Sequence, residues 1–151
     1  MVFVSLTRLR IRSWRFMPAF LWSAFRSSRQ AQGAEGFLNG KLIVDVGNTF
    51  WTVTVWTSEA AMRAYRAQGP HLRAMGKLAK WCDEASVAHW QQEGVTLPSP
   101  EDSHRQMVEK GRPSRVDNPS ADQSANRIAS PRVRTETSLP PKRAAIAQRA
   151  S

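Results

Sequence analysis

The fold of this chain is decided by the stretch Thr49-Phe50-Trp51-Thr52-Val53-Thr54-Val55-Trp56-Thr57, in which every residue is β-branched or aromatic. Residues of these two kinds favour an extended strand, whose successive side chains point to opposite faces. Trp51, Val53 and Val55 therefore share one face. Phe50 and Trp56 lie on the other face. Burial of one large apolar side chain is worth about 1.5–3 kcal/mol, so the sequence predicts a sheet that is covered on both sides.

The residues on either side of this stretch predict further strands and helices. Strands alternate with a period of two, whereas amphipathic helices repeat apolar residues every three or four positions. Glycine and proline at 69–70 divide the second helix into two pieces. The expected elements are strands at 2–11, 37–46, 49–57 and 85–92, a helix between Ser13 and Gly33, and a broken helix from Ser58 to Trp81. This β-α-β-β-α-β order predicts an α+β, ferredoxin-like fold, in which an antiparallel sheet carries its helices on one face.

The second face of such a sheet has no helices of its own. The strand at 49–57 is apolar on that face as well, and exposure of large apolar side chains to water is costly. A second copy of the chain is the simplest cover, with the two sheets packed face to face. We therefore expect a homodimer.

Composition divides the chain near residue 111. All thirteen aromatic residues lie at or before Trp90, whereas residues 112–151 contain none and hold five prolines. A segment of that composition buries too little apolar surface to fold. We expect one domain at 1–111, with its core at 1–92 and a polar helix at about 100–110, followed by a disordered basic tail at 112–151.

The chain is strongly basic, with 22 Lys and Arg against 12 Asp and Glu, and its net charge is +10. Residues 112–151 hold 8 basic and 3 acidic residues, and such a segment favours nonspecific contact with phosphates or anionic surfaces. An RNA-recognition module has the same strand order, but it needs a basic-Gly-aromatic motif on its third strand. The stretch at 49–54 lacks this motif, so we expect no specific nucleic-acid partner.

Few residues are suited to metal, disulfide or membrane chemistry. Cys82 is the only cysteine, so it forms no internal disulfide and no cysteine-based zinc cluster. His71, His89 and His104 share no metal-ligand spacing. No apolar run reaches the length of about 18 residues that a spanning helix needs, and the arginine-flanked run at 16–22 is followed by no clean cleavage site. We expect no membrane span, a retained N-terminus and a cytoplasmic protein.

Three blocks of the chain resemble a known family. They are Glu35-Gly36-Phe37, then Thr52-Val53-Thr54-Val55-Trp56 followed by Ser58-Glu59-Ala60-Ala61, and His71. The chain resembles the antibiotic-biosynthesis-monooxygenase-like superfamily, the dimeric α+β barrels, over about residues 1–92. Within it, the chain is most similar to small bacterial proteins of the spheroidene-monooxygenase-like type. The resemblance implies oxygenase chemistry that is either cofactor-free or dependent on haem.

The resemblance also implies a set of site residues. Haem-degrading members use an Asn on the first strand, a Trp on the second helix and a His as the iron ligand. This chain has Thr7, Tyr65 and His71 at or near those positions, so only the histidine is retained. The resemblance therefore implies either a haem held by His71 or no cofactor at all.

Candidate residues follow for each role. The catalytic candidates, which would move protons, are Tyr65, His71 and His89. The candidates for substrate binding are Thr7, Trp51 and Trp22. Structural alternatives remain open, since His71 also suits a solvated helix start and His89 a strand at a dimer interface.

Two functions are consistent with these residues. The first is a small monooxygenase-like protein that binds an apolar or aromatic substrate between sheet and helices. The second is a non-catalytic ligand-binding, haem-binding or stress protein on the same scaffold, which the missing Asn and Trp favour.

Overall fold

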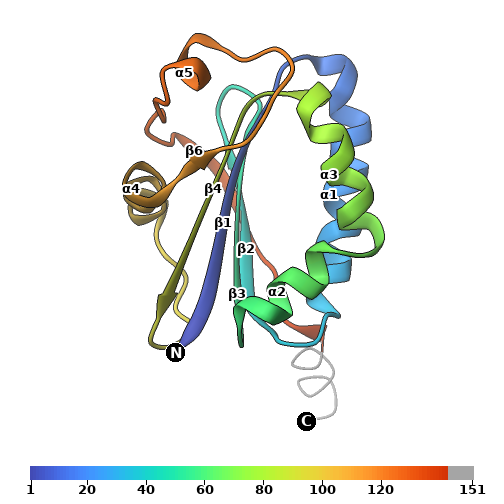
Figure 1. Cartoon of the computed structure of the whole chain (residues 1–151), viewed down its shortest axis with the longest axis vertical. Helices are drawn as coiled ribbons and strands as arrows, with labels where there is room; N and C mark the ends of the chain where they lie inside the picture. Colours follow the sequence, from blue (N-terminus) through green and yellow to red (C-terminus); the bar gives the residue numbers. More distant parts are fainter. Residues whose placement is uncertain (143–151) are drawn as a thin grey trace.

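A six-stranded antiparallel sheet forms the centre of the computed structural model, which describes residues 1–142 (Figure 1). Across the sheet, the strands are β5 (Arg112–Pro113), β4 (Cys82–Gln92), β1 (Val2–Ile11), β3 (Thr49–Trp56), β2 (Phe37–Asp45) and β6 (Val133–Ser138). The helices are η1 (Trp14–Phe16), α1 (Met17–Gln32), α2 (Glu59–Arg66), α3 (Gly69–Trp81), α4 (Pro100–Lys110) and α5 (Ala121–Ser124).

The expected ferredoxin-like α+β fold is confirmed in the order β1, α1, β2, β3, α2 with α3, and β4. The stretch that decides the fold is the central strand β3, which pairs with β1 on one side and β2 on the other. The break in the second helix lies where expected, because Gly69 adopts a φ of +65° that favours glycine. None of the helices in residues 1–142 is long and apolar enough to cross a membrane.

Helices α1, α2 and α3 cover one face of the sheet (Figure 1). Two apolar clusters hold this layer in place, one near each end of the strands. At one end, Trp56 packs against Phe37 and Tyr65. At the other end, Phe20 of α1 packs against Phe50 with a ring-centroid distance of 4.9 Å. The middle of the interface between the two clusters carries smaller side chains and forms the site described below.

The opposite face of the sheet is covered by the chain itself, not by a second copy. Figure 1 shows α4 and α5 on the side of the sheet opposite α1 and α3. Met107 of α4 is buried in one cluster with Leu6, Trp51 and Val53, and Ile128 packs against the same cluster. Trp51 is only 1% exposed within a single chain. The expectation that a second copy is needed to cover this face is therefore wrong.

The disordered tail expected from residue 112 is also wrong for residues 112–142. Strand β5 pairs with β4 at one edge of the sheet, and β6 pairs with β2 at the other. Every residue of β6 is exposed, so this strand is attached by backbone pairing and contributes little apolar burial. Apolar content does not predict such a strand, because the strand pairs through its backbone and buries little apolar surface. Residues 143–151 of the expected tail lie outside the described residues.

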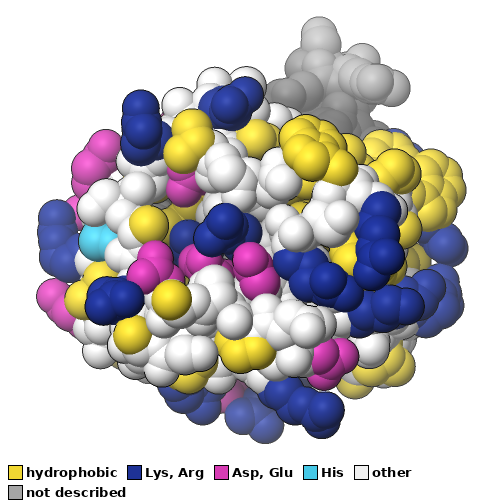
Figure 2. Space-filling view, turned by 90° about the horizontal axis from the view of Figure 1, so that it is seen from above, with side chains coloured by type: hydrophobic (Ala, Val, Ile, Leu, Met, Phe, Trp, Pro, Cys, Tyr) yellow, Lys and Arg dark blue, Asp and Glu magenta, His cyan; other side chains and the backbone are white. Residues whose placement is uncertain are grey.

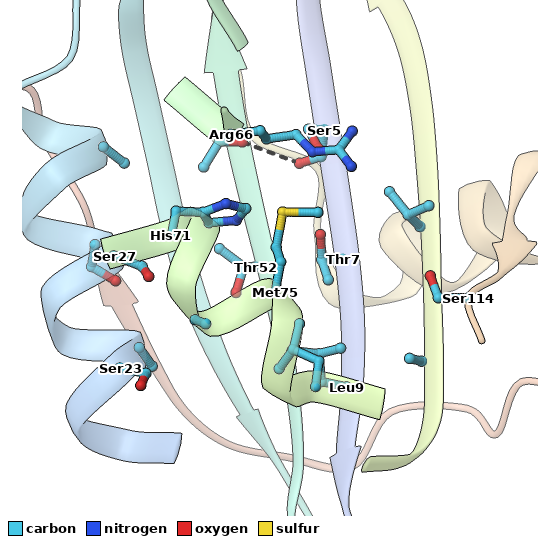
Figure 3. Close-up of a pocket in the computed structure, with 18 of the residues that line it drawn as sticks. Ser5, Thr7, Leu9, Ser23, Ser27, Thr52, Arg66, His71, Met75 and Ser114 are labelled. Atoms are coloured by element: carbon cyan, nitrogen blue, oxygen red, sulfur yellow. Dashed lines mark hydrogen bonds between the residues drawn. The ribbon is translucent and has the colours of Figure 1, made fainter. Parts of the chain in front are cut away.

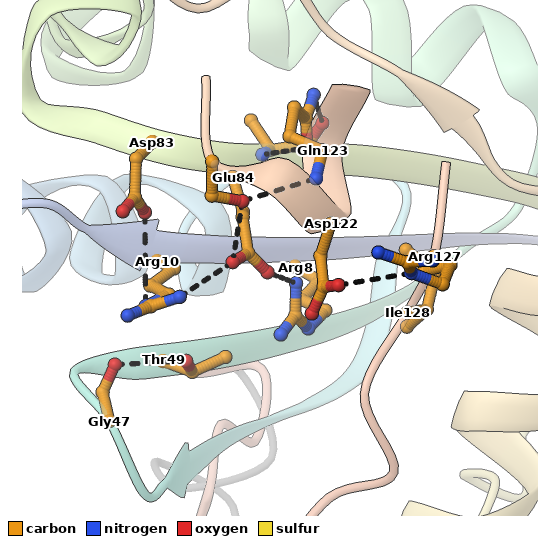
Figure 4. Close-up of polar contacts among 12 residues, drawn as sticks. Arg8, Arg10, Gly47, Thr49, Asp83, Glu84, Asp122, Gln123, Arg127 and Ile128 are labelled. Carbon is orange, nitrogen blue, oxygen red and sulfur yellow. Dashed lines mark hydrogen bonds and ion pairs between the residues drawn. The ribbon is translucent and has the colours of Figure 1, made fainter. Parts of the chain in front are cut away.

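A buried ion pair also ties the C-terminal segment to the sheet (Figure 4). Arg8 donates to Glu84 Oε1 at 2.8 Å, and Arg10 and Ser120 donate to Oε2 at 2.7 and 2.9 Å. Burial alone would raise the pKa of Glu84, but the hydrogen bonds from these three partners lower it below its usual value. Glu84 therefore stays ionised and connects β1 and β4 to the segment that precedes α5.

The packing of α4 on the sheet is tested by Met107→Ala. Because Met107 is 2% exposed, truncation should lower the free energy of unfolding by about 2–5 kcal/mol. The adjacent Val108 is 60% exposed, and Val108→Ala should change it by no more than about 0.5 kcal/mol. Urea denaturation measures both. Equal, small effects of the two substitutions would show that α4 does not cover this face.

The ion pair is tested by Glu84→Gln. Removal of one partner of a buried pair costs about 3–5 kcal/mol, because the other charge is left uncompensated. As a control, Glu136→Gln breaks the partly exposed pair with Lys41, for which we expect about 0–1 kcal/mol. The stabilisation by Glu84 should be complete above its unfolded pKa of about 4.5 and lost as the pH falls further. An unfolding free energy equal to that of the unsubstituted chain would contradict the pairing.

Candidate functional site

A cavity of about 280 Å³ lies between the sheet and helices α1, α2 and α3. Its floor is a patch of short hydroxyl side chains on the two central strands. The members of this hydroxyl floor are Ser5 and Thr7 of β1 and Thr52 and Thr54 of β3. These residues face the helices because they alternate along each strand with the residues that face α4. Their small size leaves the space that larger side chains fill at both ends of the strands.

The cavity brings Tyr65 and His71 together. Their rings pack against each other in a tilted arrangement, with centroids 4.6 Å apart and an interplanar angle of 46°. Tyr65 lies near the end of α2, and His71 lies at the start of α3. The break at Gly69 therefore places two residues that are six positions apart in the sequence side by side.

Gln30 of α1 fixes the geometry of this break. Its side-chain amide donates to the carbonyl oxygens of Tyr65 and Gln68, at 3.1 and 2.8 Å. The backbone N–H of His71 donates to Gln30 Oε1 at 2.9 Å. One side chain thus satisfies three backbone groups at the junction of α2 and α3. It holds His71 in a defined position beside the cavity.

Burial keeps the acid–base groups of the cavity in their neutral forms. Burial raises the pKa of Tyr65 well above its usual value, and the phenol O–H donates to the carbonyl oxygen of Ser27 at 3.1 Å. Burial, with a smaller effect of the Arg66 charge, lowers the pKa of His71 to about 4. At neutral pH, His71 is therefore an uncharged imidazole that can accept a proton.

Two imidazole nitrogens that border the cavity have no partner. His71 Nδ1 and His89 Nε2 are both buried and make no hydrogen bond to the residues described. Burial, followed by the charge of Arg66, lowers the pKa of His89 as well. Buried polar atoms are rarely left unpaired, so these two nitrogens stand out as unsatisfied groups on side chains that line the cavity.

The structure places four of the six candidate site residues around the cavity, namely Thr7, Tyr65, His71 and His89. Trp51 and Trp22 do not line it, so the cavity gives no support to their expected role in substrate binding. Trp51 faces α4, where its indole N–H donates to Asp45 Oδ2 at 3.0 Å. Trp22 lies on the outer side of α1 and is 61% exposed.

Several residues that line the cavity were not predicted from the sequence. Figure 3 shows Arg66 and Met75 directed from α2 and α3 toward the strand that carries Ser5 and Thr7. The alternation of threonine with large apolar residues in β3 was a signal for the hydroxyl floor. No comparable signal existed for Arg66 or Met75, because their position depends on the break between α2 and α3.

A haem does not fit this site. Cavities that hold drug-sized ligands measure about 300–1,000 Å³, and a haem is larger than most such ligands, whereas this cavity measures about 280 Å³. Among residues 1–142, no group of three His, Cys, Asp or Glu side chains is placed to hold a metal ion.

The environment of His71 is tested by its titration. An NMR pH titration should give a midpoint near pH 4, because the imidazole is buried beside Arg66. The folded-state pKa lies below the unfolded value of 6.5. The stability that neutral His71 contributes is therefore complete above about pH 6.5 and is lost as the pH falls toward 4. A midpoint near 6.5 would show a solvated histidine outside the cavity.

Comparisons with known proteins identify the fold. No protein-family model matches the chain, and no curated protein matches its sequence. A structure of a variant of SnoaB, a cofactor-independent oxygenase from Streptomyces nogalater, is 19% identical with a TM-score of 0.53, over 65% of this chain and 98% of that one. Rv0793 from Mycobacterium tuberculosis is 12% identical with a TM-score of 0.55, over 64% of this chain and 100% of that one.

A third structure, an antibiotic biosynthesis monooxygenase, is 15% identical with a TM-score of 0.54, over 62% of this chain and 100% of that one. Identities this low show a common fold and no more. The remainder of this chain lies outside the likeness. The resemblance to the antibiotic-biosynthesis-monooxygenase-like superfamily is thus confirmed at the level of the fold.

Proposed function

We propose that this chain is a small monooxygenase-like protein that oxidises an apolar or aromatic molecule in the cavity without haem. The observation that supports this most is the neutral His71, whose Nδ1 is buried and unpartnered at the wall of the cavity. A general base must be uncharged at the operating pH in order to accept a proton. Burial keeps His71 uncharged there. Its low pKa makes it a weak base, so the step requires a substrate with an acidic proton.

The walls of the cavity suit an aromatic molecule that carries a few oxygen atoms. The hydroxyl floor supplies donors and acceptors to a polar edge, while Met75, Leu78 and Phe20 supply apolar contact to the ring. At about 280 Å³ the cavity is small, so the favoured ligand is compact and flat. The positive charge of Arg66 at the edge of the cavity would stabilise an anion formed there.

The proposed chemistry begins with proton transfer to His71. Loss of a proton from an acidic C–H or O–H group makes the substrate electron-rich, so that it reduces dioxygen directly. For an anthrone, the ring methylene becomes a carbonyl, one oxygen atom enters the product and the other leaves as water. The substrate supplies all four electrons, so this reaction needs no further reductant.

The three catalytic candidates take different roles in this proposal. His71 is the base, and His89 is a second imidazole that can carry the proton away. Tyr65 is a positioning residue, because its hydroxyl already donates to Ser27 and its ring packs against His71. Thr7 belongs to the hydroxyl floor that orients the substrate.

The homodimer expected from the sequence has no part in forming this cavity. Residues of a single chain line it, and the sheet face on which a partner was expected is covered by the chain's own α4. We propose that one copy carries a whole site.

A non-catalytic binding protein is the second candidate. The observation in its favour is that the only tyrosine in the chain is already engaged with Ser27. The cavity then offers two histidines and a set of hydroxyls, which suffice to bind a ligand.

Oxygen uptake across a panel of quinols and anthrones tests the proposal. We expect turnover that falls by about 10²–10⁴-fold in His71→Phe, which retains a ring against Tyr65 but removes the nitrogen. Ala74 lines the cavity, so Ala74→Leu should block ligand binding. Ala64 is exposed on α2, so Ala64→Leu should change neither binding nor turnover.

The outcomes separate the two functions. Binding that Ala74→Leu abolishes, without turnover of any compound, would reject the oxygenase and support the binding protein. Turnover that survives in Ala74→Leu, or binding that neither cavity substitution affects, would reject the cavity as the site.

A further inference from the structure

The outer side of the helical layer exposes large apolar side chains. Leu21, Trp22 and Phe25 of α1 are 48%, 61% and 55% exposed, and Trp14 just before α1 is 72% exposed. Leu72 of α3, which packs beside α1, is half exposed as well. Large exposed apolar patches of this kind mark interaction sites on proteins. We call these five residues the aromatic patch.

Exposed cations surround the aromatic patch. The exposed basic residues of this layer are Arg15, Arg26, Arg29, Arg73, Lys77 and Lys80. None of them forms an ion pair with another described residue. The sequence contains no Asp or Glu in residues 1–34 or 67–82, so both helices and the segment before α1 are purely basic. Figure 2 shows hydrophobic and basic side chains gathered together on the right, the side on which the helices lie in Figure 1.

The spacing on α1 places both kinds of residue on one stripe. Trp22, Phe25, Arg26 and Arg29 stand at positions i, i+3, i+4 and i+7, which share a face of a helix. The rings of Trp22 and Phe25 stack at 6.0 Å, and the guanidinium of Arg29 lies 5.9 Å from the centre of the Phe25 ring. The stripe therefore presents aromatic rings with cations immediately beside them.

Charge decides between the possible occupants of this surface. A second copy paired about a two-fold axis would place the same basic surface against itself, and like charges repel. An anionic partner has the complementary charge. Leu21 and Leu72 supply aliphatic surface. Nucleic-acid bases stack on aromatic side chains and not on aliphatic ones, whereas lipid accommodates both. Trp and Phe on one helix face with Lys and Arg beside them are typical of helices that lie in a membrane interface.

We infer that the outer side of α1 and α3 docks onto an anionic lipid bilayer. The two helices lie along the headgroup plane, with the aromatic patch inserted at the boundary and the six cations near the lipid phosphates. The inner sides of the same helices line the cavity through Ser23, Ser27, Ala74 and Met75. Docking would therefore place the helical wall of the cavity next to the bilayer. This inference stands on the surface alone and does not require the proposed oxygenase activity.

Sedimentation of the full chain with lipid vesicles tests the inference. The chain should bind vesicles of mixed phosphatidylcholine and phosphatidylserine at least about tenfold more tightly than pure phosphatidylcholine, and added salt should weaken the binding. Each cation near such a surface contributes roughly fivefold. The charge variant Arg26→Glu with Arg29→Glu should therefore lose more than about tenfold. The apolar variant Trp22→Ala with Phe25→Ala should lose at least about tenfold.

Matched controls lie on other elements. Val108 of α4 is exposed and apolar, and Arg134 of β6 is exposed and basic, so Val108→Ala and Arg134→Glu should bind vesicles as the unsubstituted chain does. Equal binding to both vesicle types, no binding to either, or full binding by the two patch variants would overturn the inference. So would binding to duplex DNA or single-stranded RNA without binding to vesicles. A dimer in light scattering that the patch variants convert to a monomer would assign the surface to a second copy instead.

Discussion

The structure depends on a central strand that cannot face water on either side. β3 places Trp51, Val53 and Val55 on one face and Phe50 and Trp56 on the other, so a stable fold must cover both. The two covers differ in kind. The face toward α4 is filled by large apolar side chains, whereas the face toward α1 and α3 is filled at its ends and left open in its middle. The cavity is a consequence of where β1 and β3 carry serine and threonine.

The C-terminal segment covers the sheet face on which a partner subunit was expected. It runs along the second face as α4 and α5 and adds β5 and β6 at the two edges of the sheet. Edge strands otherwise present unpaired backbone groups to other chains. The Arg8–Glu84 pair with Ser120 anchors this segment near the middle of its course. The solved structures with the same fold match at most 65% of this chain in the comparisons described above, so about a third of it lies outside the likeness.

The resemblance placed Tyr65 and His71 at one site, and local patterns predicted the central sheet and the broken second helix. These features depend on alternation, on helix-breaking residues and on short sequence separations. Longer-range features were missed. β6 is paired through its backbone although its side chains are all exposed. Trp51 was expected at the site, although alternation with Thr52 turns it to the opposite face. Trp22 was expected there as well, and its exposure became apparent only when α1 was placed on the sheet.

Amide chemical-shift mapping during titration with a small aromatic ligand, such as a quinol, tests most directly the claim that the sheet has one open and one filled face. The account predicts that shifts concentrate at Ser5, Thr52 and His71, around the cavity, while Leu6 and Met107 in the filled face do not respond. Shifts centred on Leu6 and Met107, with none at the hydroxyl floor, would contradict it.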